Sequence, residues 1–371
     1  MLAAGGTGGH LFPAFALAEA LGRRGIPVDL VTDTRGDRYG TGFPARNIYQ
    51  VPSATGGNAL KAAFAAIQLS RGVAAAHKLL GEVKPSLVLG FGGYPTFPPL
   101  MAAKMRKIPT AVHEQNAVLG RANRMLAGRV DAIATSFAIT SGLDEALLAK
   151  AHHTGNPVRS VVVEAALRHY WRPEPSQPVN LLVFGGSQGA RFFSDVVPAA
   201  LSQLPPSMRE RINVTQQARD EDVERVKAAY AGRGIRAEVA TFFKDLPFRM
   251  AASHFVIGRA GASTVAELTV IGRPAILVPL PHSLDNDQLH NAQRLAESGG
   301  AWCIEQKVLS PDRLAAEVEM LISRPAMLAQ AATAAKLQGR PDAVERLADM
   351  VVSLMANAGR ARAAQGVASK D

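Results

Sequence analysis

The sequence opens with Met1-Leu2-Ala3-Ala4-Gly5-Gly6-Thr7-Gly8-Gly9-His10, an apolar start that runs directly into a glycine-dense turn. A similar junction, Val183-Phe184-Gly185-Gly186-Ser187-Gln188-Gly189-Ala190-Arg191, follows about half the chain later. Each pairs a short apolar run with a glycine-rich turn and then a helical pattern, which is typical of a parallel strand that enters a helix. The fold class predicted from these two junctions is α/β, with two Rossmann-like domains.

Further short apolar runs along the chain extend this alternation of strands and helices. They predict parallel strands at 28–31, 87–90, 110–113, 132–134, 181–184, 255–258 and 275–278. Glycine and proline interrupt the pattern near Thr154-Gly155-Asn156-Pro157, so we place the domain boundary there. The expected organisation is a first domain at 1–157, a second at 158–337, a helix at about 338–357 that joins the first domain, and a disordered tail at 358–371.

Composition narrows the class of protein. The chain has 371 residues, a formal net charge of +10 and a single cysteine, Cys303. The charge favours a partner that carries phosphate, and one cysteine excludes an intrachain disulfide and points to the reducing cytosol. The Lys and Arg residues are scattered, so we expect no nucleic-acid partner. No signal peptide is visible, and the first strand is so short that we expect the natural chain to start upstream of Met1.

The uncharged stretch from Pro85 to Ala103 is long enough to span a bilayer by residue count alone. Gly92, Gly93 and several prolines interrupt it, which would leave backbone groups unpaired in lipid. We therefore expect a buried strand followed by a loop.

The first glycine-rich turn has the character of an anion-binding loop, because glycines allow close backbone approach and the following helix offers unpaired N–H groups. Leu11 stands where the dinucleotide fingerprint has its third glycine, and no Gly-Lys-Ser/Thr follows. These departures disfavour a nicotinamide-dependent oxidoreductase and a P-loop hydrolase.

Two loops after later strands could line the same crevice. Gly92-Gly93-Tyr94 forms a second glycine-rich loop, and His113-Glu114-Gln115-Asn116 is dense in polar groups. The second loop has two interpretations that the sequence leaves open, a polar binding loop or a helix start with Asn116 as the N-cap.

Two motifs in the second half are also ambiguous. Thr264 and Glu267 fit a capping box, which competes with a role for Glu267 in binding a ribose diol. The stretch from His282 to Asn291 holds two histidines and two aspartates, but its spacing fits no standard metal site. Its Gln and Asn side chains suit sugar hydroxyls better, so we expect no metal site.

Six motifs, taken in order, resemble the MurG family of bacterial N-acetylglucosaminyltransferases. They are Gly5-Gly6-Thr7-Gly8-Gly9-His10, Gly92-Gly93-Tyr94, His113-Glu114-Gln115-Asn116, Gly155-Asn156-Pro157-Val158-Arg159, Gly185-Gly186-Ser187-Gln188-Gly189-Ala190 and Gly261-Ala262-Ser263-Thr264-Val265-Ala266-Glu267. The resemblance runs from Ala4 to about Gln306. It implies the GT-B architecture, in which two Rossmann-like domains face a cleft. It also implies transfer of N-acetylglucosamine from its UDP form to undecaprenyl-pyrophosphoryl-muramyl-pentapeptide, with inversion, in peptidoglycan synthesis.

The resemblance further implies roles for particular residues. We take His10 as the candidate general base and Gly92, Gly93 and Tyr94 as acceptor-side loop residues. Phe243 is expected beside uracil and Gln288 at the sugar hydroxyls. The full set of donor-binding residues implied is Thr7, Gly8, Gly9, Asn116, Arg159, Ser187, Phe243, Ala262, Ser263, Thr264, Val265, Ala266, Glu267 and Gln288.

We expect no required cofactor, although Mg²⁺ can stimulate by pairing with the released diphosphate. The expected partners are UDP-N-acetylglucosamine, the lipid-linked acceptor and an anionic membrane, at the cytoplasmic face of the bacterial inner membrane. The segment 58–80, with Leu60, Phe64 and Ile67 on one helical face and cations beside it, is the expected docking surface. The alternatives are another GT-B lipid glycosyltransferase, a UDP-sugar epimerase, or a non-enzymatic membrane adaptor with this fold.

Overall fold

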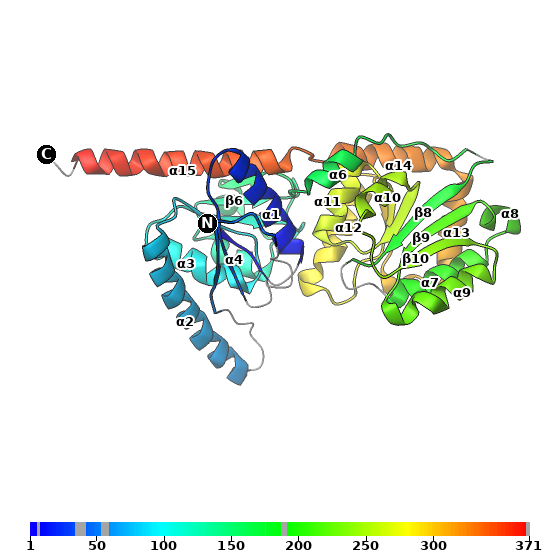
Figure 1. Ribbon diagram of the computed structural model, residues 1–371, viewed down its shortest axis with the longest axis horizontal. Helices are drawn as coiled ribbons and strands as arrows, with labels where there is room; N and C mark the ends of the chain where they lie inside the picture. Colours follow the sequence, from blue (N-terminus) through cyan, green and yellow to red (C-terminus); the bar gives the residue numbers. More distant parts are fainter. Residues whose placement is uncertain (6–7, 34–41, 53–58, 175, 187–190, 369–371) are drawn as a thin grey trace. The chain divides into compact units, whose positions relative to one another are not determined.

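The computed structural model describes residues 1–5, 8–33, 42–52, 59–174, 176–186 and 191–368, with only the backbone at 8, 59–66 and 361–368. The chain forms two compact units (Figure 1). Unit 1 comprises Met1–Arg159 and Pro341–Asp371, and unit 2 comprises Ser160–Arg340. The boundary thus falls two residues after the one expected from the sequence.

Among the described residues, unit 1 contains a seven-stranded sheet in the order β3-β2-β1-β4-β5-β6-β7, and all of its pairs are parallel. The strands are β1 (Leu2–Ala3), β2 (Asp29–Thr32), β3 (Asn47–Gln50), β4 (Val88–Gly90), β5 (Thr110–Glu114), β6 (Ala132–Thr135) and β7 (Ala151–His153). The helices are α1 (Gly8–Arg23), α2 (Ala59–Val83), η2 (Tyr94–Thr96), α3 (Phe97–Met105), α4 (Arg121–Ala127), α5 (Glu145–Leu148) and α15 (Ala343–Ala368).

Unit 2 contains a six-stranded parallel sheet in the order β10-β9-β8-β11-β12-β13 within the described residues. The strands are β8 (Val179–Phe184), β9 (Ile212–Gln217), β10 (Arg236–Ala240), β11 (Phe255–Gly258), β12 (Ala275–Leu277) and β13 (Ala301–Cys303). The helices are α6 (Ser160–Ala165), α7 (Arg191–Ser202), α8 (Pro206–Arg209), η3 (Asp220–Asp222), α9 (Val223–Ala231), α10 (Leu246–Ala252), α11 (Ala262–Ile271), η4 (Leu284–Asn286), α12 (Asp287–Glu297), η5 (Gln306–Val308), α13 (Pro311–Ser323) and α14 (Pro325–Gln338).

The strand orders confirm the predicted fold class of two Rossmann-like domains. In each sheet the order reverses between the first strand of the unit and the fourth, at β1/β4 in unit 1 and at β8/β11 in unit 2. A crevice opens beyond the carboxyl ends of the strands at such a reversal, and ligands bind there. The glycine-rich loop after β1 and the loop after β4 flank the first reversal.

Two expectations about local structure are wrong. The expected loop after β4 is the helix α3, because Pro98 and Pro99 occupy its first turn, where no N–H is needed for a helical hydrogen bond. The expected disordered tail is instead helical to Ala368, since its Ala- and Arg-rich composition favours helix.

Helix α15 belongs to unit 1, where it packs beside α1 (Figure 1). Leu347 and Val351 enter the apolar core of unit 1. On the surface, Arg24 pairs with both Glu345 and Asp349, which ties the two helices together through residues more than 300 positions apart.

Candidate functional site

In unit 1, His10 lies in the first turn of α1 and faces the glycine loop after β4. The carbonyl oxygen of Gly5 is 3.2 Å from His10 Nδ1, so this nitrogen donates and Nε2 is the basic nitrogen of the ring. A Cβ placed on Gly92 would lie 3.4 Å from His10 Nε2. Gly92 and Gly93 both have positive φ, at 85° and 74°, so the backbone conformation disfavours any side chain there.

Glu114 is the centre of a hydrogen-bond network at the end of β5. Its Oε1 accepts from the backbone N–H of Asn116 at 3.0 Å and from Asn116 Nδ2 at 3.2 Å. Its Oε2 accepts from the N–H of Gly120 at 2.9 Å and from Asn123 Nδ2 at 2.8 Å. Burial raises the pKa of Glu114, and these four donors oppose the rise because they favour the carboxylate.

This network reaches the surroundings of His10. A Cβ on Gly92 would contact both His10 Nε2, at 3.4 Å, and Asn123 Nδ2, at 3.5 Å. Asn123 is almost fully buried, and its Oδ1 has no hydrogen-bond partner. The Glu114 carboxylate therefore fixes the loop after β5 and the side chain of Asn123 around the same glycine that the candidate base faces.

In unit 2, the amino terminus of α11 has no side-chain cap. Its N-cap is Gly261, which offers no side chain to the free N–H groups of the first turn. The buried hydroxyl of Ser263 in that turn also has no hydrogen-bond partner. Uncapped N–H groups and the positive end of the helix dipole together favour a phosphate group at this position.

Two amides from α12 hold the loop that leads into α11. Gln288 Oε1 accepts from the N–H groups of Ala260 at 3.3 Å and of Leu280 at 3.0 Å. The buried Asn291 donates to the carbonyl oxygen of Ala260 at 3.1 Å. With Oε1 fixed in this way, Gln288 presents its Nε2 group as a hydrogen-bond donor at the carboxyl edge of the sheet.

Arg259, which directly follows β11, also contributes to this carboxyl edge of the sheet. Its guanidinium donates to the carbonyl oxygens of Val278 and Pro279 at 3.0 and 3.1 Å, and to Gln306 Oε1 at 2.6 Å. It also lies over the ring of Phe193, 5.0 Å from the centroid. Arg259 therefore joins the segments that follow three neighbouring strands, β11, β12 and β13.

Comparison with known proteins places this arrangement in a family. The model of the glycosyltransferase family 28 N-terminal domain matches residues 1–135, and that of the C-terminal domain matches residues 180–347. The chain belongs to glycosyltransferase family 28. A relative from Mesorhizobium japonicum, named UDP-N-acetylglucosamine--N-acetylmuramyl-(pentapeptide) pyrophosphoryl-undecaprenol N-acetylglucosamine transferase, is 53% identical over 95% of this chain and 94% of its own length. A relative of the same name from Methylobacterium sp. strain 4-46 is 54% identical over 95% of each chain.

Among solved structures, MurG from Acinetobacter baumannii matches with a TM-score of 0.79 and 28% identity, over 95% of this chain and 98% of that one. The resemblance to the MurG family and the GT-B fold class are confirmed. As a family 28 member, the chain is a glycosyltransferase.

The structure brings some of the predicted site residues of this family 28 chain together. His10, Gly92 and Gly93 meet in unit 1, and Tyr94 begins the short helix η2 that follows them. In unit 2, Ala262, Ser263 and Thr264 form the first turn of α11, whereas Val265 and Ala266 continue the helix. Gly8 and Gly9 begin α1, and Thr7 and Ser187 lie outside the described residues.

Other predicted residues have surroundings that the sequence did not indicate. Asn116 is not an N-cap, because α4 begins at Arg121 after Gly120, and Asn116 instead binds Glu114. The capping box is also wrong, since Thr264 is the third residue of α11 and its N-cap is Gly261.

Two more of the predicted residues, Arg159 and Phe243, each take part in an arginine–aromatic contact. The guanidinium of Arg159 lies 5.2 Å from the centre of the Phe12 ring, within unit 1. The ring of Phe243 is 7% exposed beneath Arg249, whereas the neighbouring Phe242 is 69% exposed. The exposed ring of this loop is therefore one that the sequence did not single out.

The sequence did not indicate that Glu114 and Asn123 form a hydrogen-bond network beside His10. Glu114 stood in a motif that the sequence marked as polar, but nothing in the order of residues shows that four donors converge on it. Asn123 lies nine residues later on α4, and only the packing of α4 beside β5 brings it to the carboxylate.

His113 gives a prediction for acid stability. It is fully buried, its Nε2 lies 3.1 Å from the carbonyl oxygen of Gly155, and its Nδ1 accepts from Gln115 Nε2 at 2.9 Å. Burial lowers the pKa of His113 from 6.5 to about 4. Folding therefore favours the neutral ring, so the stability that it contributes is complete above pH 6.5 and is lost as the pH falls from 6.5 to 4. The difference corresponds to about 3 kcal/mol.

His113→Gln cannot take up this proton. Between pH 7 and pH 4 the unfolding free energy of unit 1, measured with urea, should fall by about 3 kcal/mol less in this variant than in the unchanged protein. The exposed His152 supplies the matched control, since His152→Gln should leave the slope unaltered. Equal slopes for the His113 variant and the unchanged protein would show that His113 is not buried as a neutral ring.

Proposed function

We propose that this protein transfers N-acetylglucosamine from UDP-N-acetylglucosamine to the muramyl sugar of undecaprenyl-pyrophosphoryl-muramyl-pentapeptide. The observation that carries the proposal is the 53% identity, over nearly the whole chain, to a relative that bears this name. The geometry supports it independently, since unit 1 presents a histidine base beside a glycine loop and unit 2 presents an uncapped helix terminus.

The proposed reaction divides the work between the units. The donor diphosphate lies at the start of α11, whose N–H groups stabilise the charge that develops as the bond from the sugar C1 to the diphosphate oxygen breaks. His10 Nε2 takes the proton from the acceptor hydroxyl while its oxygen forms the new bond to C1. Attack and departure on opposite faces of the sugar invert C1, and UDP leaves.

The direct test supplies radiolabelled UDP-N-acetylglucosamine with the lipid-linked acceptor. The label should move to the lipid fraction, with one UDP released for each sugar transferred. An epimerase would instead give an isomerised UDP-sugar without any acceptor, and an adaptor would give neither product.

Glu267 is the proposed ligand of the donor ribose. It is 9% exposed in the second turn of α11, one turn beyond the proposed diphosphate site. Hydrogen bonds to a charged group contribute about 1.5–3 kcal/mol, so Glu267→Ala should raise the KM for the donor by roughly tenfold or more. Steady-state kinetics with varied donor measure this, with Glu224→Ala on the exposed side of α9 as the control. An unchanged KM in a folded variant would confine Glu267 to a packing role.

We also propose that transfer requires no bound metal. Within the described ranges, no group of three or more His, Cys, Asp or Glu side chains converges as a metal site would require. Excess chelator should leave at least about half of the rate, since helix N–H groups can carry the phosphate charge. Complete loss of activity in chelator, restored by Mg²⁺, would contradict this.

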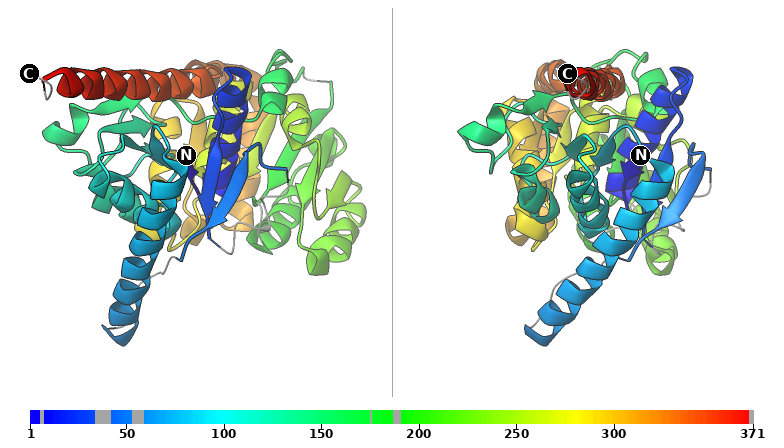
Figure 2. Two further views of the ribbon diagram at one scale, coloured as in Figure 1. Left: turned by 60° about the vertical axis from the view of Figure 1, so that its left-hand side comes forward. Right: turned by 90° about the vertical axis from the view of Figure 1, so that its left-hand side faces the viewer.

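The proposed location is the cytoplasmic face of the inner membrane, where the protein binds peripherally to anionic lipid. No helix in the described part of the chain has the length and apolar character to cross a bilayer. In unit 1 the proposed contact is α2, whose first half extends beyond the sheet (Figure 2). Ile67 is 54% exposed and Arg71 and Lys78 are exposed, as an interfacial helix requires. The side chains of Leu60 and Phe64 lie outside the described residues.

A further inference from the structure

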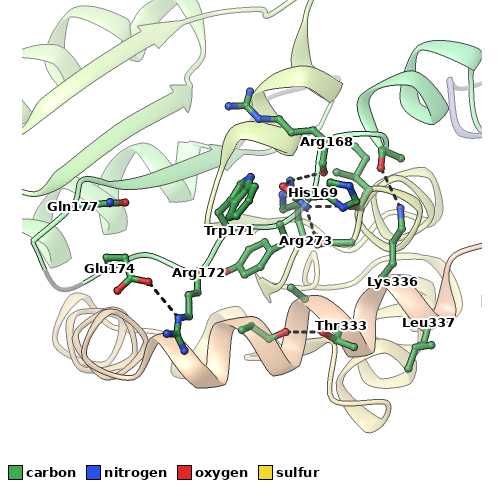
Figure 3. Close-up of a pocket in the computed structure, with 16 residues that line it drawn as sticks. Arg168, His169, Trp171, Arg172, Glu174, Gln177, Arg273, Thr333, Lys336 and Leu337 are labelled. Atoms are coloured by element: carbon green, nitrogen blue, oxygen red, sulfur yellow. Dashed lines mark hydrogen bonds and ion pairs between the residues drawn. The ribbon is translucent and has the colours of Figure 1, made fainter.

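The three most exposed large apolar side chains in the described residues lie close together in unit 2. Leu167, Trp171 and Leu337 are 77%, 74% and 71% exposed. Trp171 and Leu337 line a groove of about 780 Å³, and Leu167 stands between two residues that also line it (Figure 3). A group of exposed apolar side chains on one face of a protein marks an interaction surface.

This groove is distinct from the proposed donor site. It is formed by residues of 166–174 together with Gln177, all before β8, by Ile271-Gly272-Arg273 before β12, and by α14. These segments precede their strands, so they lie toward the amino edge of the sheet, whereas the nucleotide-binding crevice of such a sheet lies at the carboxyl edge.

A buried arginine, Arg273, joins the backbone segments beside the groove. The buried guanidinium of Arg273 donates to the carbonyl oxygens of Arg168, His169 and Ala251. It also lies 5.2 Å from the centre of the Tyr170 ring, and the Tyr170 hydroxyl donates to the His254 carbonyl oxygen at 3.1 Å. These bonds anchor the backbone at Arg168 and His169, which lies just before Trp171.

The charge around the groove is positive. Arg168, Arg172, Arg273 and Lys336 line it, and Glu174 is the one carboxylate among the lining residues that the structure describes. Glu174 pairs with Arg172 at 3.4 Å. The Lys336 ammonium donates to the carbonyl oxygens of Val270 and Ala166.

The distribution of apolar and polar groups indicates what binds here. The most exposed apolar side chains, Leu167, Trp171 and Leu337, stand next in sequence to exposed cations, Arg168, Arg172 and Lys336. Leucine and tryptophan that project beside Arg and Lys are the arrangement by which proteins lie on an anionic bilayer.

We propose that the groove face, defined as Leu167, Arg168, Trp171, Arg172, Lys336 and Leu337, binds the surface of an anionic membrane. Trp171 and the two leucines enter the headgroup region, and the cations contact lipid phosphates. This inference rests on the proposed function at one point. An enzyme with a lipid-linked acceptor must work at a membrane surface. The groove face gives unit 2 a membrane contact of its own, additional to α2 of unit 1.

Tryptophan fluorescence provides a direct test, because the chain has only two tryptophans, Trp171 and Trp302. In the Trp302→Phe variant all tryptophan emission comes from Trp171. Vesicles of phosphatidylcholine with a quarter phosphatidylglycerol should shift this emission to the blue and protect it from acrylamide. Pure phosphatidylcholine vesicles should not, and high salt should reverse the effect.

Sedimentation with the same vesicles measures membrane binding directly. The variants compared keep both tryptophans and carry only the charge substitutions. Arg168→Glu/Arg172→Glu should weaken the partition coefficient by about tenfold or more at low salt. Lys227→Glu/Arg233→Glu, which alters the net charge equally at α9 and just beyond it, should weaken it by no more than about threefold. Arg71→Glu/Lys78→Glu, in parallel, measures the contribution of α2.

Unaltered Trp171 emission under conditions that sediment the protein would overturn the proposal and leave α2 as the membrane contact. Equal losses in the groove and α9 variants would overturn it too, because the binding would then follow net charge alone. UDP affinity, measured on each variant, confirms that unit 2 is folded. The assay contains neither donor nor acceptor, so its failure would leave the proposed transfer reaction untouched.

Discussion

His10→Gln should lower kcat by about a hundredfold or more while the KM for the donor changes by less than about threefold. General bases contribute roughly 10²–10⁴ to the rate, and the structure gives His10 the features of one. Its Nδ1 donates to the Gly5 carbonyl oxygen, which fixes the tautomer and leaves Nε2 to receive a proton beside Gly92. Glutamine retains the polarity of the side chain but cannot act as a base.

The measurement is the pH dependence of kcat with lipid-linked acceptor, in which the decline on the acidic side that a histidine base causes should disappear in the variant. His152→Gln, which removes an exposed histidine from the same unit, is the control and should leave the profile unaltered. A kcat within tenfold of the unchanged protein, in a folded His10 variant, would exclude His10 as the base.

Glu114→Ala should lower the transfer rate by about a hundredfold and destabilise unit 1 by about 3 kcal/mol. The change removes the acceptor of four N–H groups at the end of β5, and buried donors left without a partner are costly. The loop from Asn116 to Gly120 and the side chain of Asn123 would then lose their common anchor. Displacement by about 1 Å near a reacting group can cost a hundredfold in rate.

Glu114→Gln separates the effect on the site from the effect on the fold. Glutamine fills the same space, but its NH₂ group must face donors where the carboxylate offered an acceptor. This variant should remain folded and still lose at least about tenfold in kcat, since Asn116 and Asn123 are no longer held together. Thermal unfolding and kinetics measured on both variants, with the exposed Glu145→Gln as control, test this positioning role. Normal kinetics in Glu114→Gln would limit the carboxylate to supporting the fold.

The predictions that the structure confirms depend on patterns among residues close together in the sequence. Apolar runs such as 181–184 and 255–258 lie in the buried strands β8 and β11, because a parallel strand covered on both faces is mostly apolar. The glycine loops at 92–93 and 261 could be placed because backbone conformation and strand-to-helix turns are local properties. The family resemblance rests on the order of the same local motifs.

Several of the predictions that failed depended on where a helix starts. Thr264 and Glu267 have the spacing of a capping box, but α11 begins two residues before Thr264, at Ala262. The loop that enters α11 is held by Gln288 and Asn291 of α12, about thirty residues further along the chain. A tertiary tether of this kind overrides the local capping preference, and a sequence pattern does not register it.

The sequence by itself determined two parallel α/β domains, the glycine-rich loops at their strand ends and the family to which the chain belongs. These follow from hydrophobic period, glycine and the order of motifs, which neighbouring residues define. Only the tertiary structure decided that Glu114 gathers Asn116, Gly120 and Asn123, that His10 faces Gly92, and that Trp171 and Leu337 share one groove. Each of these depends on segments distant in sequence being brought within hydrogen-bond or van der Waals range, and packing of the whole unit fixes those distances.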